Sequence, residues 1–230
     1  MSRGLPAGTP PAAVSAASAA LALPTTATRR AGARPGAPAT GRVRLFLALW
    51  PGEATRRRLA GWRDRWRWPP GTTVVPDARL HVTLHFLGDV PQSDVARLID
   101  ALAVPFEPFT LRLGAPAQWP GGIAALVPDA VPPGLLRLHA DLGAALRGLG
   151  LPVEARAYRP HVTLARRAAG ARAPDAGPAL HWPVRAWVLV QSTLGPAGGY
   201  RVLRRFDAGR AREAGPAVDG TRPALSRRRP

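Results

Sequence analysis

One six-residue pattern, Arg-x-His-Val-Thr-Leu, occurs twice in this chain, at residues 79–84 and 159–164. Each copy places a histidine and a threonine two positions apart within a run of Val and Leu, which is typical of a β-strand. Side chains on a strand alternate between its two faces, so His81 shares a face with Thr83, and His161 shares a face with Thr163. Two such strands side by side would bring two imidazoles and two hydroxyls to one cleft.

That set of side chains suits acid/base chemistry on a phosphate ester. Imidazole titrates near neutral pH, so a histidine pair can hold one base and one acid at the same time. Threonine hydroxyls can donate to phosphate oxygens, and an arginine can stabilise the charge that builds up there. Arg166 is a candidate for that role, but it follows His161 by five positions. On a regular strand it would face away from His161, so a cleft position requires a bend or a strand end.

The remaining histidines carry weaker signals. His85 follows His81 by four positions and is expected on the same strand face, at the rim of the cleft. His139 reads as a structural residue of a helix and His181 as a structural residue at a loop end. A metal site could be imagined from His81, His85 and His161, but no carboxylate lies beside them at ligand spacing. We expect no metal and no cofactor.

Residue types that are absent exclude several mechanisms. The chain contains no Cys, which excludes thiolate nucleophiles and Cys-ligated zinc. It also contains no Lys, so it has neither a phosphate-binding P-loop nor a lysine that could form a nucleotide intermediate. Every positive charge is therefore an arginine, and the excess reflects either genome composition with a solvated surface or attraction to polyanions such as RNA.

Length and charge distribution predict one folded domain between two tails. A chain of 230 residues with 46% hydrophobic content suits one domain or one domain with two lobes. Residues 1–40 carry four Arg and no acid, and residues 208–230 carry a net charge of +4, so +10 of the total +18 belongs to residues 41–207. We expect Ala/Pro/Arg-rich disordered tails at 1–40 and 208–230. A faint signal-peptide core at 12–23 and a later translation start are alternatives for the first tail.

Hydrophobic periodicity between the tails predicts strands alternating with helices. Strands are expected at 42–50, 73–75, 80–87, 109–113, 123–127, 161–166, 184–194 and 200–206, with a loop at 168–178. Helices are expected after Pro51, at 95–102 and at 135–149, and the first of them should bury its Trp residues and expose its Arg residues. Each motif strand lies downstream of a helix. This order predicts an α+β fold, bilobal and internally duplicated, with two antiparallel sheets flanking a central cleft and helices outside.

With its two motifs, the chain resembles the 2H phosphoesterase superfamily, which is named for two His-x-Thr/Ser-x motifs. It is most similar to the bacterial RNA 2′,3′-cyclic phosphodiesterases, once called 2′-5′ RNA ligases, over about residues 42–207. The segments that carry the resemblance are 44–49, 80–88 (LHVTLHFLG), 159–166 (RPHVTLAR) and 191–200. The departures are the two tails and Trp119, where the family has Phe.

The resemblance implies metal-independent hydrolysis of a 2′,3′-cyclic phosphate to a 2′-phosphate, with ATP-independent 2′-5′ joining of RNA ends as the reverse reaction. It implies that His81 is the proton donor and His161 the proton acceptor, although the near-symmetric motifs alone leave the two roles open. It also implies that Thr83, Thr163 and Arg166 hold the phosphate. The partners would be RNA with 2′,3′-cyclic phosphate ends or small cyclic nucleotides, and we expect a cytoplasmic monomer with no membrane span.

Two other functions remain open from the sequence. A related enzyme could act on ADP-ribose 1″,2″-cyclic phosphate or on a small cyclic nucleotide with the same motifs. Alternatively, the His-Thr strands could only pack within an RNA-binding module, whose salt-dependent binding would survive loss of both histidines.

Overall fold

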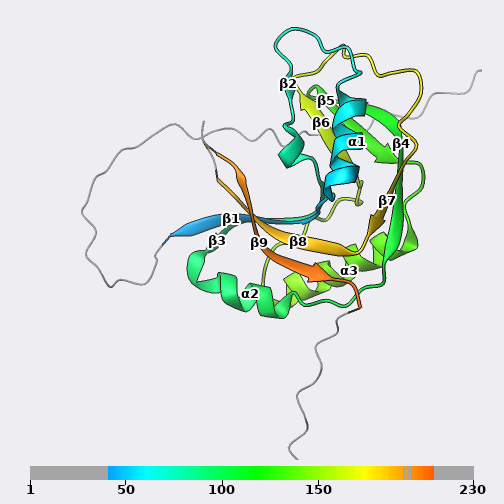
Figure 1. The fold of residues 1–230 in the computed structure, drawn as a ribbon. Helices are drawn as coiled ribbons and strands as arrows, with labels where there is room; N and C mark the ends of the chain where they lie inside the picture. Colours follow the sequence, from blue (N-terminus) through cyan, green and yellow to red (C-terminus); the bar gives the residue numbers. More distant parts are fainter. Residues whose placement is uncertain (1–40, 194, 196–197, 210–230) are drawn as a thin grey trace, which may run out of the picture.

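A computed structural model describes residues 41–193, 195 and 198–209 (Figure 1). The expected tail at 1–40, and all but the first two residues of the tail at 208–230, lie outside the described residues. Within the described part of the chain, no helix is long and apolar enough to cross a membrane.

Nine strands, paired antiparallel throughout the described residues, form the sheet framework. They are β1 (Arg42–Leu49), β2 (Thr73–Val74), β3 (Val82–Pro91), β4 (Phe109–Trp119), β5 (Ile123–Pro128), β6 (Val162–Arg166), β7 (Leu180–Val184), β8 (Ala186–Ser192) and β9 (Tyr200–Asp207). Their order is β7-β4-β5-β6-β3-β1-β8-β9, with β2 paired to β6. The motif strands β3 and β6 are therefore neighbours at the centre.

The two halves of this framework meet at a single residue pair. Val82 of β3 pairs with Val162 of β6, and these two strands then diverge. One lobe consists of β3, β1, β8 and β9, and the other consists of β6, β5, β4, β7 and β2. The expectation of two separate sheets is corrected accordingly, because the lobes form one continuous hydrogen-bonded path. Figure 1 shows the two groups of strands turned away from each other on either side of this junction.

Helices cover the outside of the lobes and share one core with them. They are α1 (Glu53–Arg63), α2 (Val95–Ala101) and α3 (Pro133–Gly148), with short 3₁₀ turns η1 (Asp77–Arg79) and η2 (Gln92–Asp94). α3 buries a stripe of four leucines at positions 135, 138, 142 and 146, the spacing of one helix face. It contacts β3, although the motif strand that follows it in the chain is β6, in the other lobe. Likewise α1 contacts β7, although the motif strand that follows it is β3, in the other lobe.

The segment 180–192 differs from its prediction. The strand expected at 184–194 is present as β8 (Ala186–Ser192), but a separate strand, β7 (Leu180–Val184), precedes it in the other lobe and was not predicted. His181 therefore lies on a strand and not at a loop end. Pro183, which cannot donate to a ladder, is tolerated because β7 is the edge strand of its lobe. The other predicted strands and the three predicted helices are present, with boundaries shifted by a few residues except at β4, which continues to Trp119.

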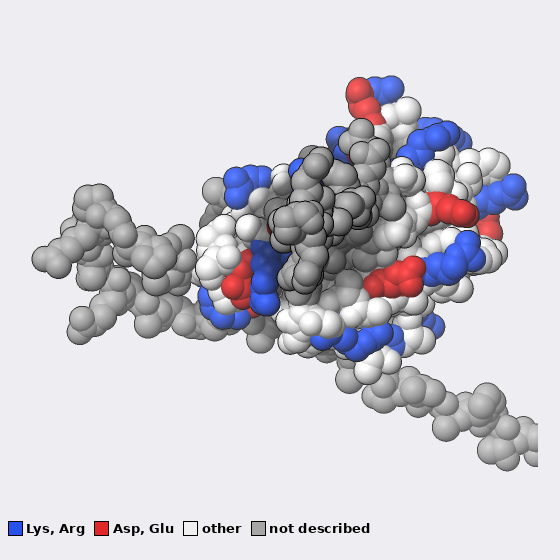
Figure 2. Space-filling view, turned by 90° about the horizontal axis from the view of Figure 1, so that it is seen from below, with Lys and Arg blue, Asp and Glu red and all other residues white. Residues whose placement is uncertain are grey.

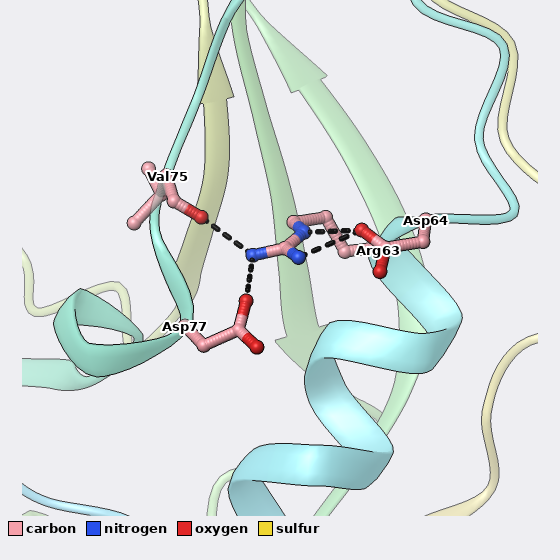
Figure 3. Close-up of polar contacts among 4 residues, drawn as sticks. All are labelled: Arg63, Asp64, Val75 and Asp77. Atoms are coloured by element: carbon pink, nitrogen blue, oxygen red, sulfur yellow. Dashed lines mark hydrogen bonds and ion pairs between the residues drawn. The ribbon is translucent and has the colours of Figure 1, made fainter.

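Arg63 is a further correction, because it is not part of the exposed arginine face of α1. Its side chain is only 7% exposed, and its guanidinium bonds Asp64 Oδ1, the Val75 carbonyl and Asp77 Oδ1 (Figure 3). The Nη1–O distances to Val75 and Asp77 are 2.6 and 2.7 Å. One arginine thus ties the end of α1 to the segment that leads into the first motif strand. Trp62 on the same helix and Trp66, three residues beyond its end, are core residues, as predicted.

Charged side chains are interspersed on the face that carries α2 and α3. Figure 2 shows arginines and acidic residues side by side there, with no large area of one sign. Where the described residues are visible in this view, the positive charge is therefore not collected in one area.

Candidate active site

A cleft of about 430 Å³ lies between the two lobes. It is lined by Arg44, Phe46, Thr73, Val74, Val75, Pro76, Arg79, His81, Thr83, Phe86, His161, Thr163, Arg166, Ser192 and Tyr200. All five side chains expected in the site, namely His81, Thr83, His161, Thr163 and Arg166, are among them. The described residues that line the cleft include three arginines and no acidic side chain. Such a lining attracts an anion.

The two imidazoles are held in the same way. Nδ1–H of His81 donates to the Arg79 carbonyl over 2.6 Å, and Nδ1–H of His161 donates to the Arg159 carbonyl over 2.7 Å. In each case the acceptor lies two residues before the histidine. Since a neutral imidazole carries one N–H, this bond leaves Nε2 of each ring as the basic nitrogen. Thr83 Oγ1 lies 3.2 Å from Nε2 of His81 and can donate to it.

Burial favours the neutral form of both histidines. Desolvation lowers the pKa of His81 to about 4, and the positive charges of His161 and Arg166 act in the same direction against the Arg79 carbonyl. Desolvation also lowers the pKa of His161, assisted by Arg166 and opposed by the Arg159 carbonyl. At neutral pH and without an anion in the cleft, both Nε2 atoms are therefore proton acceptors.

A β-bulge brings Arg166 to the cleft. Against β5, the register runs from Thr163–Ala125 to Ala165–Ala124, so β6 contains one extra residue at Leu164. An extra residue shifts the alternation of side chains by one position, and Arg166 returns to the face of His161 and Thr163. The bend that the five-residue offset requires is thus present within the strand.

A second β-bulge, in β3, turns His85 away from the cleft. Against β1, the register of β3 runs from Thr83–Ala48 to His85–Leu47, which leaves Leu84 as the extra residue. The prediction that His85 borders the cleft is wrong, because the bulge turns it to the opposite face. His85 is 4% exposed, its Nε2–H donates to the His139 carbonyl over 2.8 Å, and its ring stacks on that of His139 at 4.1 Å. Both histidines therefore join β3 to α3.

Aromatic side chains surround the imidazoles, and the sequence reading did not assign them to the site. Trp50 stacks on His81 with a centroid distance of 5.4 Å, and the rings of Phe46 and Tyr200 lie 5.1 and 5.5 Å from it. Trp119 meets the ring of His161 edge-on at 4.5 Å. These rings exclude water from the imidazoles and account for the desolvation. A usable signal was the position of Trp50 and Trp119 directly beside turn residues.

A hydroxyl outside the cleft supports the first motif strand from behind. Tyr158 OH donates to the Thr83 carbonyl over 3.1 Å, and its ring stacks on His139 at 3.9 Å. Its place next to the second motif, three residues before His161, gave no sign that it contacts the first.

The cleft, with two tethered imidazoles, two hydroxyls and an arginine, has the composition of a phosphoesterase site. Residues 51–195 match the family model of the 2′-5′ RNA ligase superfamily. The chain is 35% identical over 198 residues to an RNA 2′,3′-cyclic phosphodiesterase of Thermus thermophilus, covering 79% of this chain and 98% of that protein. It is 26% identical over 126 residues to an RNA 2′,3′-cyclic phosphodiesterase of Methanocaldococcus jannaschii, covering 54% and 71% of the two chains.

Solved structures agree with the sequence matches. The crystal structure of E. coli LigT complexed with 3′-AMP is similar with a TM-score of 0.66 and 28% identity, covering 74% of this chain and 99% of that one. The structure of TT0787 of T. thermophilus gives a TM-score of 0.62 and 33% identity over 71% and 97% of the two chains. The chain belongs to the 2′-5′ RNA ligase superfamily, which confirms the resemblance drawn from the two motifs.

Proposed function

We propose that this protein hydrolyses RNA 2′,3′-cyclic phosphodiester ends to 2′-phosphomonoesters by acid/base catalysis with two histidines. The observation that carries the proposal is the pair of imidazoles with equivalent backbone tethers, which share one acid-free cleft with Thr83, Thr163 and Arg166. The activity named for the T. thermophilus relative supports the same substrate class.

In this reaction His161 acts as the proton acceptor and His81 as the proton donor. Nε2 of His161 takes a proton from water, whose oxygen attacks the phosphorus and forms the new P–O bond. The P–O3′ bond breaks, and protonated His81 gives its proton to the 3′-oxygen. The lowered pKa of His161 keeps it neutral and ready to accept. The bound phosphate anion favours the imidazolium form of His81, because an opposite charge nearby raises a histidine pKa.

Arg166 and the two threonines stabilise the phosphate during the reaction. Arg166 places a permanent positive charge in the cleft, and Thr83 and Thr163 add hydroxyl donors. Preorganised donors of this kind supply the charge stabilisation that a metal ion would otherwise give. The proposal therefore includes no metal and no cofactor. ATP-independent 2′-5′ joining of RNA ends uses the same two proton transfers in the same order: His161 takes the proton of a 5′-hydroxyl that attacks the phosphorus in place of water, and His81 protonates the 3′-oxygen that leaves.

We also propose how the chain is organised and where it acts. The catalytic domain spans residues 41–207, acts as a monomer, and works in the cytoplasm where RNA ends are processed. Its two lobes arose by internal duplication, which the strand–helix–motif-strand order β1-α1-β3 and β5-α3-β6 supports.

The test is hydrolysis of an oligoribonucleotide that ends in a 2′,3′-cyclic phosphate, with EDTA present. The product of the wild-type protein is expected to be the 2′-phosphate, identified by ³¹P NMR. His81→Ala and His161→Ala should each lower kcat by about 10²-fold or more. His181→Ala is the matched control, because His181 is exposed on β7 and does not line the cleft.

Other results would redirect the proposal. Turnover of ADP-ribose 1″,2″-cyclic phosphate or of a small cyclic nucleotide, without turnover of RNA ends, would move the substrate to those compounds. Salt-dependent RNA binding that survives loss of both histidines, with no turnover, would indicate a binding module. Loss of activity in EDTA, restored by a divalent ion, would refute the metal-free mechanism.

A further inference from the structure

Phe86 occupies the position in the first motif strand that Arg166 occupies in the second. Each follows its histidine by five residues, and each lies beyond a one-residue bulge that turns it to the cleft face. Both side chains line the same cleft. The duplicated motif therefore delivers a cation at one place and an aromatic ring at the other.

The two side chains lie toward opposite ends of the cleft. β3 and β6 are antiparallel and pair at Val82 and Val162, so each strand leaves this junction in its own direction. Phe86 follows Val82 by four residues, a distance of ~13 Å along a strand that rises ~3.3 Å per residue. Arg166 follows Val162 by the same four residues, but its side chain is longer and its charge acts on both imidazoles, whereas no aromatic contact among the described residues joins Phe86 to either of them. A phosphate held between the imidazoles therefore lies beside Arg166, and Phe86 is placed for a neighbouring nucleotide.

Phe86 offers more free ring surface than the aromatic residues around His81, although the Arg44 guanidinium lies over its ring. Phe46, Trp50 and Tyr200 pack against His81 and against each other. Among the described residues, no aromatic pair includes Phe86, and 51% of it is exposed. A large apolar side chain left exposed inside a cleft is typical of a ligand contact.

Arg44 accompanies this ring. Its guanidinium carbon lies 4.7 Å from the centroid of Phe86, and it lines the cleft beside Ser192, its neighbour on β8. In the part of the chain that the structure describes, no ion pair involves Arg44. A cation without an acidic partner next to an aromatic ring matches a nucleotide, which combines a phosphate with a base that can stack.

We propose that Phe86 and Arg44 form a second subsite, for the nucleotide on the 5′ side of the terminal cyclic phosphate. Its base stacks on Phe86, and Arg44 contacts the phosphodiester that joins the last two nucleotides. This inference rests on the proposed function and narrows the substrate to RNA ends of at least two nucleotides, in preference to mononucleotides. Stacking accepts any base, so the subsite selects length and not sequence.

The experiment compares three substrates that end in a 2′,3′-cyclic phosphate. They are a cytidine mononucleotide, a tetranucleotide, and the same tetranucleotide with an abasic site at the penultimate position. We expect the wild-type kcat/KM to be higher for the intact tetranucleotide than for the other two. Phe86→Leu should lower the ratio of tetranucleotide to mononucleotide kcat/KM by about 5- to 150-fold, the range for loss of one stacked base. Phe86→Trp should retain the ratio.

Leu136→Ala serves as the matched control, since Leu136 is 48% exposed on α3 and lies outside the cleft lining. It should leave the ratio unchanged. Phe86→Leu and the abasic site should not add their effects, because both remove the same contact. An equal ratio in wild type and Phe86→Leu, or full additivity of the two changes, would overturn the subsite.

The proposed function fails in a different way. Its failure is an absence of turnover of all three substrates by the wild-type protein, or turnover that persists in His81→Ala and His161→Ala. Binding of the corresponding 2′-phosphate products, measured by fluorescence anisotropy, then tests the subsite without catalysis. A tetranucleotide advantage that Phe86→Leu removes would support it, and equal binding of both lengths would refute it.

Discussion

Tyr158→Phe tests whether the first motif strand depends on a hydroxyl that lies outside the cleft. The Tyr158 hydroxyl donates to the Thr83 carbonyl over 3.1 Å, on the residue next to the bulge of β3. Phenylalanine keeps the ring and its stacking on His139 at 3.9 Å. The substitution therefore removes one hydrogen bond and leaves a half-buried carbonyl without its donor.

The expected cost is about 1–2 kcal/mol, because an unsatisfied carbonyl costs more than the net value of an average hydrogen bond. For a domain of this size that lowers Tm by about 2–8 °C. Activity should fall as well, since Thr83 and His81 lie on the strand that loses its support. A displacement of reacting groups by ~1 Å can cost about 10²-fold in rate, so we expect kcat to fall by up to that factor with a smaller change in KM.

The assay combines thermal unfolding with steady-state hydrolysis of the cyclic phosphate substrate. Tyr200→Phe is the matched control for stability, because Tyr200 is the other tyrosine of the chain and is 39% exposed. It should change the free energy of unfolding by no more than about 0.5 kcal/mol. Wild-type Tm and kcat in Tyr158→Phe would refute the reasoning, whereas a lower Tm with unchanged kcat would limit the hydroxyl to a structural role.

Four further measurements test other parts of the site and the fold. Arg166→Ala should lower kcat by about 10²–10³-fold, as expected for loss of a preorganised donor, and Arg166→Lys should recover part of it; normal steady-state kinetics would remove Arg166 from the site. In an NMR titration of the free protein, His81 should titrate near its lowered pKa of about 4, and inorganic phosphate should raise that value. The free energy of unfolding, measured in urea, should be highest above pH ~6.5 and should decrease as the pH falls toward 4. The reason is that histidines such as His139, with a pKa of about 4 in the folded protein, stay neutral there while the unfolded chain binds protons, so His139→Gln should weaken this pH dependence. Arg63→Met keeps the packing but loses the bonds to Val75 and the two aspartates, so it should cost about 1–3 kcal/mol by chemical unfolding, and an unchanged midpoint would contradict the anchoring role of Arg63.

The parts of the fold that the sequence predicts well are set by local periodicity. The alternation in 80–84 and 160–164, and the leucine stripe of α3, depend only on which face of one element is buried. Neighbours in the chain determine that face. The His-Thr pairs were therefore placed on one face each, and the structure brings both pairs to the same cleft.

Features that depend on a second strand could not be read in the same way. The bulges at Leu84 and Leu164 are visible only in the register against β1 and β5. Without the first bulge His85 would face the cleft, and without the second Arg166 would face away from it. One extra residue in each strand reverses both assignments.

Two other errors come from residues that have atypical surroundings. Leu180, Trp182 and Val184 do alternate as buried residues of a strand, but Pro183 between them argues against one unless the strand is at an edge. Arg63 stands among exposed arginines in the sequence, and its partner Asp77 lies fourteen residues away on η1. The local sequence pattern shows neither that β7 is an edge strand nor that Arg63 has Asp77 as its partner.

Because the two motifs are nearly identical, any chemical difference between the two histidines has to come from their surroundings. His81 is enclosed by Trp50, Phe46 and Tyr200, whereas His161 meets one ring, that of Trp119. The two strands also differ beyond their bulges, because β3 presents Phe86 to the cleft and β6 presents Arg166. A symmetric pair of strands thus produces a centre whose two halves offer the substrate different chemistry. The reaction we propose, with one oxygen leaving and water attacking from the other side of the phosphorus, requires such a difference, which the surroundings of the histidines supply and the motifs alone do not.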